Sequence, residues 1–251
     1  MKNKSPEQAR KYSRLNLFIR SSIFSSILVP TCILYSLICI LSTPLSLYWR
    51  SRIARWWIIG MVKLCKIICH IDYQIEGLQN LKKAKTPIVM SKHQSAWEAF
   101  YLTAILPEAA IITKRELMWV PFFGWAFNVL KPISINRSNK KSAMQQLIEQ
   151  GKVALDQGRP MLIFPEGTRI PAGKVGHYKL GGARLSEATG YPIVPVAHNA
   201  GRYWPRRQFI KIPGTVRLCF GPPIYPQGKT AEEILALTKD WIENKMTEID
   251  R

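Results

Sequence analysis

The chain has 251 residues, of which 36 are lysine or arginine and 16 are aspartate or glutamate, so its formal net charge is +20. So large a basic excess implies an anionic partner, either nucleic acid or a membrane surface. No zinc-finger, helix-turn-helix or RNA-binding pattern accompanies the charge, so we expect no nucleic-acid partner. The five cysteines form no CxxC pair and only four histidines are present, which excludes a disulfide scaffold and predicts no metal site.

The first apolar segment lies within a stretch that has no acidic residue between Glu7 and Asp72. Residues 21–49 carry no charge at all, and a bilayer span needs only about 20 apolar residues. The segment is too long for a signal-peptide core, and no small-x-small cleavage site follows it. Because basic residues flank both ends, we favour a shallow two-helix insertion bent near Pro30 or Pro44, with a single span as the alternative.

A second segment, residues 51–69, has the pattern of an amphipathic helix. At 100° per residue its four basic residues share one arc of roughly 80°, with apolar residues opposite. This is typical of a helix at a membrane interface, and the alternative is a helix that packs its apolar face onto the next domain. The expected organisation is a basic tail (1–20), a membrane-associated helical region (21–70) and one folded domain (71–251).

Beyond residue 70, short apolar runs alternate with amphipathic helices, which predicts an α/β domain. A helix is expected near 139–157, ending at Gly158, and a last helix opens with a capping box formed by Thr230 and Glu233. The expected strands are 71–75, 87–90, 110–113, 132–135, 161–164, 193–197 and 215–220.

The most informative motif pairs His93 with Glu98, directly after the apolar run 87–90. A neutral imidazole can take a proton from a hydroxyl, and a carboxylate on its other nitrogen fixes the tautomer and stabilises the imidazolium. On a continuous helix a spacing of five would set the two side chains roughly 140° apart. We therefore expect His93 on a strand-to-helix turn. Ser95 lacks the G-x-S-x-G elbow of a nucleophile, so we expect a turn or helix cap there.

Four further segments follow His93 in a fixed order. They read Thr113-Lys114-Arg115-Glu116-Leu117 with Pro121-Phe122-Phe123-Gly124, then Ile133-Ser134-Ile135-Asn136-Arg137, then Phe164-Pro165-Glu166-Gly167-Thr168-Arg169, then Tyr191-Pro192-Ile193-Val194-Pro195-Val196. With the His-x4-acid motif, this set resembles the glycerolipid acyltransferase superfamily, and within it the bacterial 1-acylglycerol-3-phosphate acyltransferases. The resemblance covers roughly residues 71–225.

The resemblance implies a mixed sheet flanked by helices and an N-terminal hydrophobic membrane-attachment region. It also implies transfer of an acyl chain from an acyl thioester to the sn-2 hydroxyl of lysophosphatidic acid, giving phosphatidic acid. His93 is then the general base and Glu98 its orienting partner. The implied substrate-binding residues are Lys114, Arg137, Glu166, Gly167, Thr168 and Arg169.

Two positions depart from the family pattern. The superfamily motif usually reads Asn-His-x4-Asp, whereas here Lys92 precedes His93 and the acid is Glu98; Asn136 stands where the family often has aspartate. Glutamate keeps the charge but adds a methylene, so the backbone must accommodate a longer reach.

The resemblance further implies that no cofactor is needed beyond the acyl-CoA or acyl carrier protein that serves as co-substrate. The expected location is the inner membrane, with the catalytic domain facing the cytoplasm and a phospholipid surface as partner. Two alternatives stay open: an acyltransferase for another lysolipid or amino-lipid, and a non-catalytic basic membrane-binding protein. An assay with lysophosphatidic acid and an acyl thioester separates the three.

Overall fold

The computed structural model describes residues 12–135 and 140–250, without the side chains of residues 114, 115, 134 and 140–142. Its helices are α1 (Arg14–Leu41), α2 (Leu47–Cys69), α3 (Gln79–Lys83), α4 (Trp97–Ile105), α5 (Phe123–Val129), α6 (Lys140–Asp156), α7 (Gly181–Thr189) and α8 (Ala231–Ile249), with 3-10 turns η2 (Arg115–Trp119) and η3 (Ala200–Arg202). Its strands are β1 (Ile71–Glu76), β2 (Ile88–Ser91), β3 (Ala110–Lys114), β4 (Ile133–Ile135), β5 (Met161–Ile163), β6 (Ile193–His198) and β7 (Gly214–Phe220).

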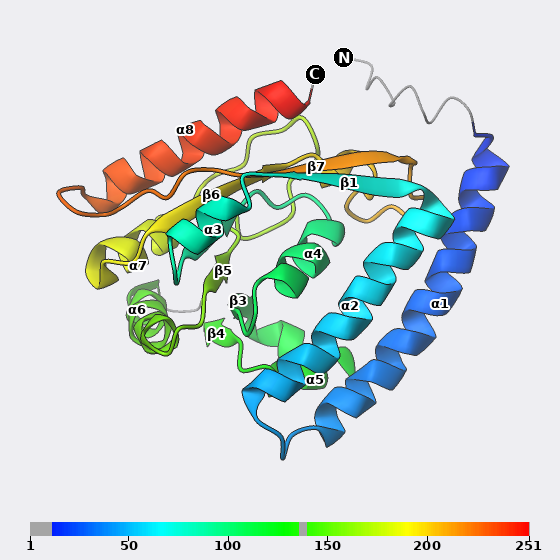
Figure 1. Cartoon of the computed structure of the whole chain (residues 1–251), viewed down its shortest axis with the longest axis horizontal. Coiled ribbons are helices and arrows are strands. Elements are labelled where there is room, and N and C mark those ends of the chain that lie inside the picture. The colour runs from blue at the N-terminus through cyan, green and yellow to red at the C-terminus, as the bar shows by residue number, and fades with distance from the viewer. Residues whose placement is uncertain (1–11, 136–139, 251) are drawn as a thin grey trace.

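The seven strands form one mixed sheet in the order β1-β7-β6-β2-β5-β3-β4, which confirms the predicted fold class. Every neighbouring pair is parallel except β6 and β7, which run antiparallel. The central strands β6, β2 and β5 are buried on both faces, as the continuous apolar runs in the sequence predict. Helices lie on both sides of this sheet (Figure 1).

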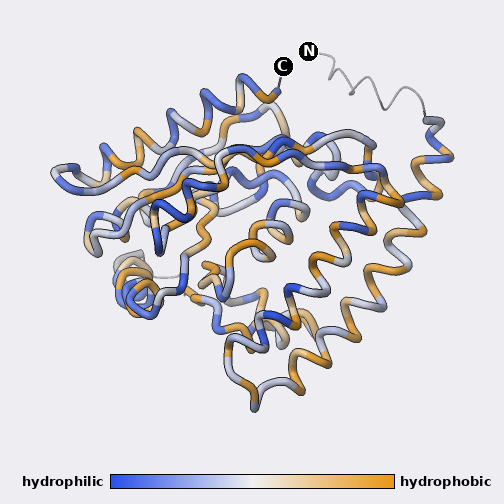
Figure 2. Tube along the Cα trace, viewed as in Figure 1, coloured by the Kyte–Doolittle hydropathy of each residue, from blue (hydrophilic) through white to orange (hydrophobic). Residues whose placement is uncertain are grey.

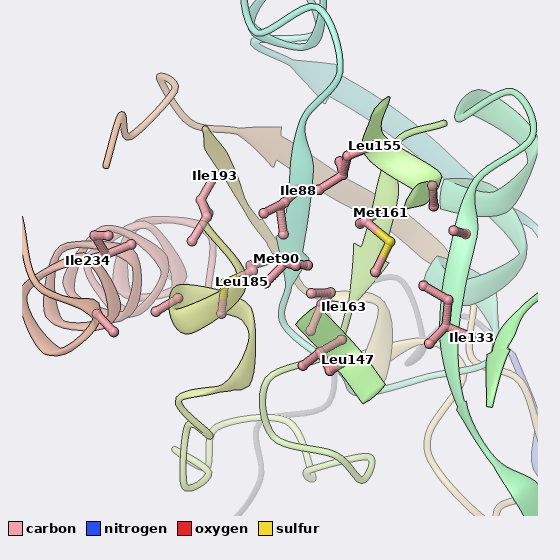
Figure 3. Packing of buried hydrophobic residues seen from close by; sticks show 14 of the residues in the cluster. Ile88, Met90, Ile133, Leu147, Leu155, Met161, Ile163, Leu185, Ile193 and Ile234 are labelled. Carbon is pink, nitrogen blue, oxygen red and sulfur yellow. The ribbon is translucent and has the colours of Figure 1, made fainter. Parts of the chain in front are cut away.

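Successive residues of β2 point to opposite faces and so join two different cores. Ile88 and Met90 pack with Leu147 of α6 and Leu185 of α7, in the cluster drawn in Figure 3. Val89 packs on the other face with Leu102 of α4. The sheet is therefore held between α6, α7 and α8 on one side and α2 and α4 on the other.

Helices α1 and α2 form a hairpin that stands beside the sheet (Figure 1). The turn between them, residues 42–46, contains Pro44, whereas Pro30 lies inside the continuous helix α1. Helix α1 starts at Arg14, earlier than the uncharged segment, because Ser13 caps it by accepting a hydrogen bond from the Asn16 amide at 3.2 Å. The end of the expected 1–20 tail is therefore helical, and residues 1–11 lie outside the described part.

The two helices of the hairpin differ in what they bury. Trp57, Met61 and Cys65 of α2 are buried against α4 and β1, so its apolar face packs onto the folded domain. Helix α1 is largely apolar beyond its first two turns (Figure 2) and is long and apolar enough to cross a membrane, although only 17% of its most apolar window is buried. It is still tied to the domain, because Phe24 is fully buried with an edge-to-face contact to Trp204 at 5.5 Å.

Candidate active site

The candidate site lies where the carboxyl ends of parallel strands meet at one edge of the sheet. β2 lies between β5 and β6 and runs parallel to both. The loop of residues 92–96, here called the His93 loop, follows β2, and the turn of residues 164–170, the Glu166 turn, follows β5. The end of an open α/β sheet formed by such carboxyl ends is where ligands ordinarily bind.

The His93 loop is a strand-to-helix turn, as predicted, and it brings His93 and Glu98 together. Nδ1 of His93 lies 2.8 Å from Oε1 of Glu98, which stands in the first turn of α4. The same oxygen accepts the amide N–H groups of Gln94 and Ser95, each at 2.9 Å. The extra methylene of glutamate is thus accommodated by a carboxylate that folds back over the loop. The Ser95 hydroxyl accepts the Trp97 amide at 3.1 Å, which agrees with the expected turn, whereas Ala96 is the N-cap of α4.

The electrostatics of the pair leave Nε2 of His93 as the free base. Burial alone would raise the pKa of Glu98, but the nearby His198, the hydrogen bond from His93 and the Ser95 amide bring it below the usual glutamate value. The ionised carboxylate keeps the proton of His93 on Nδ1. Within the described residues, nothing forms a hydrogen bond with Nε2, and the ring stacks on Phe164 with centroids 4.0 Å apart.

The Glu166 turn fixes the backbone of His93 through two hydrogen bonds. Oε2 of Glu166 accepts the His93 amide at 2.8 Å, and the Ile170 amide donates to the His93 carbonyl at 2.8 Å. Gly167 adopts a φ of +66°, a conformation that side-chain-bearing residues rarely tolerate, and its N–H closes the turn on Phe164. Two short segments far apart in the sequence therefore fix the position of the base.

Two cavities meet at His93, Phe164 and Arg169. The apolar cavity, of about 350 Å³, runs between the sheet and the hairpin. Its lining includes Tyr35, Cys39, Trp57, Phe100, Phe127 and Leu130. The arginine cavity, of about 410 Å³, is lined by Gly167, Thr168, Arg169, Arg206 and Arg207 in addition to His93. The base thus faces an apolar space on one side and a cationic space on the other.

Comparison with known proteins agrees with this geometry. The acyltransferase family model matches residues 72–199, which is about half of the chain and includes the His93 loop and the Glu166 turn. The chain belongs to the acyltransferase family. It is 38% identical to the 1-acyl-sn-glycerol-3-phosphate acyltransferase of Pseudomonas aeruginosa over 92% of this chain and 91% of that protein.

This acyltransferase also matches more distant relatives in sequence and in structure. A 1-acyl-sn-glycerol-3-phosphate acyltransferase of Limnanthes douglasii is 29% identical over 83% of this chain and 74% of its own length. The crystal structure of the 1-acyl-sn-glycerophosphate acyltransferase of Thermotoga maritima superposes with a TM-score of 0.78. That match is 24% identical in sequence and covers 94% of this chain and 97% of the other, so it shows the same fold.

The residues implied as substrate-binding fall into three groups. Thr168 and Arg169 are exposed and line the arginine cavity, as does Gly167. Glu166 of this acyltransferase is buried and acts on the His93 backbone instead of facing the cavity. Lys114 ends β3 with its side chain outside the described part, and Arg137 and Asn136 lie outside it entirely.

Arg206 and Arg207 are site residues that sequence reasoning missed. Nη1 of Arg206 donates to the Arg169 carbonyl at 2.6 Å, and Arg207 adopts a φ of +59°. In the described part of the chain, neither these two nor Arg169 forms an ion pair with a carboxylate. A pair of adjacent arginines carries little signal among 36 basic residues, and only the fold brings it beside Arg169.

Two further histidines, His198 and His177, lie outside the His-x4-acid motif. His198 is fully buried, its Nε2 donates to the Lys92 carbonyl at 2.7 Å, and burial lowers its pKa. It is therefore a structural residue behind the His93 loop. His177 is exposed and lines neither cavity.

Proposed function

We propose that the protein transfers an acyl chain from an acyl thioester to the sn-2 hydroxyl of lysophosphatidic acid, giving phosphatidic acid. The observation that carries the proposal is the free Nε2 of His93 at the junction of an apolar and a cationic cavity. Lysophosphatidic acid fits this arrangement, because its free hydroxyl lies between an acyl chain, which suits the apolar cavity, and a phosphate, which suits the arginine cavity. The relatives from Pseudomonas aeruginosa and Limnanthes douglasii are named for the same activity.

The reaction needs one base and no covalent acyl-enzyme. Nε2 of His93 removes the proton as the acceptor hydroxyl attacks the thioester carbonyl, and Glu98 stabilises the imidazolium. The new C–O bond forms, the C–S bond breaks, and the imidazolium returns its proton to the leaving thiolate. The Glu98 carboxylate contributes through its charge and through the tautomer that it fixes.

The arginine cavity is the proposed site of the acceptor phosphate. A guanidinium matches phosphate oxygens with two parallel hydrogen bonds, which suits Arg169 and its neighbours Arg206 and Arg207. Thr168 adds a hydroxyl to the lining, and Gly167, which has no side chain, lets the phosphate approach the backbone. The family resemblance adds Lys114 and Arg137 to this set. The apolar cavity is the proposed site of an acyl chain.

Replacing Arg169 with alanine is expected to raise the KM for lysophosphatidic acid, with a smaller effect on kcat. Loss of a charge-assisted hydrogen bond costs about 1.5–3 kcal/mol, which corresponds to roughly a 10-fold to 150-fold change in KM. The KM for a neutral monoacylglycerol acceptor should stay unchanged. The matched control is Arg184→Ala, an exposed arginine of α7 outside both cavities. Equal losses towards both acceptors would show that Arg169 does not bind the phosphate.

We further propose that α1 attaches the protein to the cytoplasmic face of the inner membrane. Its exposed face is apolar and includes Leu34, Leu37 and Leu41. At the start of α2, Arg52 lies over the rings of Tyr48, Trp49 and Trp56. Exposed tryptophan and tyrosine beside arginine are typical of the membrane–water interface.

The variant Leu34→Glu/Leu37→Glu is expected to move the protein from membranes to the supernatant. A charged side chain in the hydrocarbon region costs about 2.5–3.5 kcal/mol. Unaltered protein should stay in the vesicle pellet even at about 1 M salt, where the Debye length is only ~3 Å. Leu237→Glu on the exposed face of α8 is the control. Release of the unaltered protein by salt alone would contradict attachment through α1.

An acceptor-and-donor panel tests the proposed activity. Purified full-length protein in detergent is supplied with acyl-CoA or acyl carrier protein thioester and with lysophosphatidic acid, another lysophospholipid or an amino-lipid. Formation of phosphatidic acid at a rate well above that of any other product supports the proposal. Preference for another acceptor would favour a sibling acyltransferase, and no product with any pair would favour a non-catalytic membrane protein.

A further inference from the structure

The residue before the base is a buried lysine, which needs an explanation of its own. The side chain of Lys92 is only 1% exposed, and a buried ammonium is costly unless it is paired. Its Nζ lies 3.0 Å from Oε1 of Glu166 and 2.7 Å from Oε1 of Glu243, and it donates to the Lys174 carbonyl at 3.2 Å. Lys92 is thus held between the Glu166 turn and the last helix, α8.

Glu166 has two tasks in this cluster, one for each carboxylate oxygen. Oε2 accepts the His93 amide at 2.8 Å, whereas Oε1 forms the ion pair with Lys92. Burial raises the pKa of Glu166, and the nearby Lys92 charge opposes that rise. Any movement of the Lys92 ammonium towards Glu166 therefore acts on the carboxylate that holds the base.

Glu243 is placed to balance the charge of Lys92. It lies 151 residues away in the sequence, on α8, and its Oε1 also accepts the Tyr178 hydroxyl at 2.7 Å. The face of the Tyr178 ring lies 5.7 Å from the Lys92 ammonium. The Glu243 side chain is 20% exposed, so its charge lies in a partly desolvated position.

The backbone of Lys92 is fixed as firmly as its side chain. Its amide donates to the Val196 carbonyl at 3.0 Å, and its own carbonyl accepts from Nε2 of His198 at 2.7 Å. Lys92 is thus held through both its backbone and its side chain, directly before His93.

We propose that Glu243 is a positioning residue for His93, which acts through Lys92 and Glu166. Asparagine, the usual residue of the superfamily at position 92, would bring no charge, and this chain has a lysine there together with a glutamate on α8 that faces it. Glu243 forms an ion pair with the Lys92 ammonium and so keeps it from moving closer to Glu166. Glu166 then stays in the position in which it accepts the His93 amide. The role in catalysis rests on the proposed function.

The test compares Glu243→Gln, Lys92→Asn and the double variant in the full-length protein. Glutamine keeps the oxygen that accepts from Tyr178 but removes the charge. For Glu243→Gln we expect kcat to fall about tenfold or more while KM for both substrates stays within about twofold, because a small displacement of a catalytic group is costly. The double variant should lose much less than the product of the two single losses, because it removes the Lys92–Glu243 pair as a whole.

The matched control is Glu248→Gln, which removes an exposed glutamate of the same helix that pairs with Lys245. It should change neither kcat nor the thermal midpoint. Unchanged kcat in Glu243→Gln, a loss confined to KM, or single losses that multiply in the double variant would each overturn the proposal. Should Glu243→Gln not fold, the double variant decides: a kcat well above that of Lys92→Asn alone supports the pairing, and a kcat equal to or below it overturns the pairing.

Thermal midpoints of the same variants separate this inference from the proposed function. If the unaltered protein forms no phosphatidic acid, the proposed function fails. The pairing is then still tested, because non-additive midpoints support it and additive midpoints overturn it.

Discussion

His93→Ala is expected to lower kcat for acyl transfer by about 10² to 10⁴, the range expected when a general base is lost. The side chain lines two cavities and does not belong to any of the hydrophobic core clusters of the described residues, so its removal should leave the fold and membrane attachment unchanged. The measurement is initial rate with saturating lysophosphatidic acid, with vesicle sedimentation and thermal unfolding on the same sample. His177→Ala, which removes an exposed histidine, is the control. A folded His93→Ala enzyme within threefold of wild type would exclude His93 as the base.

The second large effect is expected at Glu98. Glu98→Gln should lower kcat by about 10²-fold or more, because it removes the charge that stabilises the imidazolium and fixes the tautomer. Glu98→Asp keeps the charge and only shortens the reach, so its loss should be much smaller.

The alternative role for Glu98 is favourable interaction with the helix dipole at the start of α4, worth only about 0.3–1 kcal/mol. Glu232, an exposed acid in the first turn of α8, provides a matched control through Glu232→Gln. Rates and thermal midpoints of all three variants distinguish the two roles. A Glu98→Gln enzyme as active as wild type would leave Glu98 with a capping role alone.

The sheet was predictable because its strands carry a clear local signal. Each of the seven expected strands is present with its ends displaced by at most one residue, as in the expected 193–197 and the observed β6, Ile193–His198. The helix that ends before Gly158 and the capping box of Thr230 and Glu233 are also confirmed. Apolar runs bounded by glycine, proline and polar residues are local features, so one chain is enough to locate them.

The short helices and the partners of α2 were harder to predict. The sequence indicated a helix after His93 without giving its bounds and did not place α5, because the nine and seven residues of α4 and α5 are too few for a distinct helical period. For residues 51–69 the sequence left an interfacial helix and a packed helix open, because an apolar face looks the same in both cases. The structure packs that face onto the domain and leaves the more apolar α1 exposed.

The centre of the candidate site could be predicted, but not its support. His93 and Glu98 are five residues apart, and a turn suffices to join them. Lys92 and Glu243, by contrast, meet only because α8 packs across β6 at the end of the fold. Contacts of that kind depend on the tertiary fold and leave no local pattern in the sequence.

Direct transfer to the acceptor hydroxyl, assisted by His93 and Glu98, is the central claim, and the position of the transferred chain tests it most directly. Lysophosphatidic acid with one chain length at sn-1 is incubated with a thioester of a different chain length, and the products are fragmented by mass spectrometry. The account predicts phosphatidic acid with the transferred chain at sn-2, formed by the wild type and lost in His93→Ala. Transfer of that chain to the protein itself, or undiminished product from His93→Ala, would contradict it.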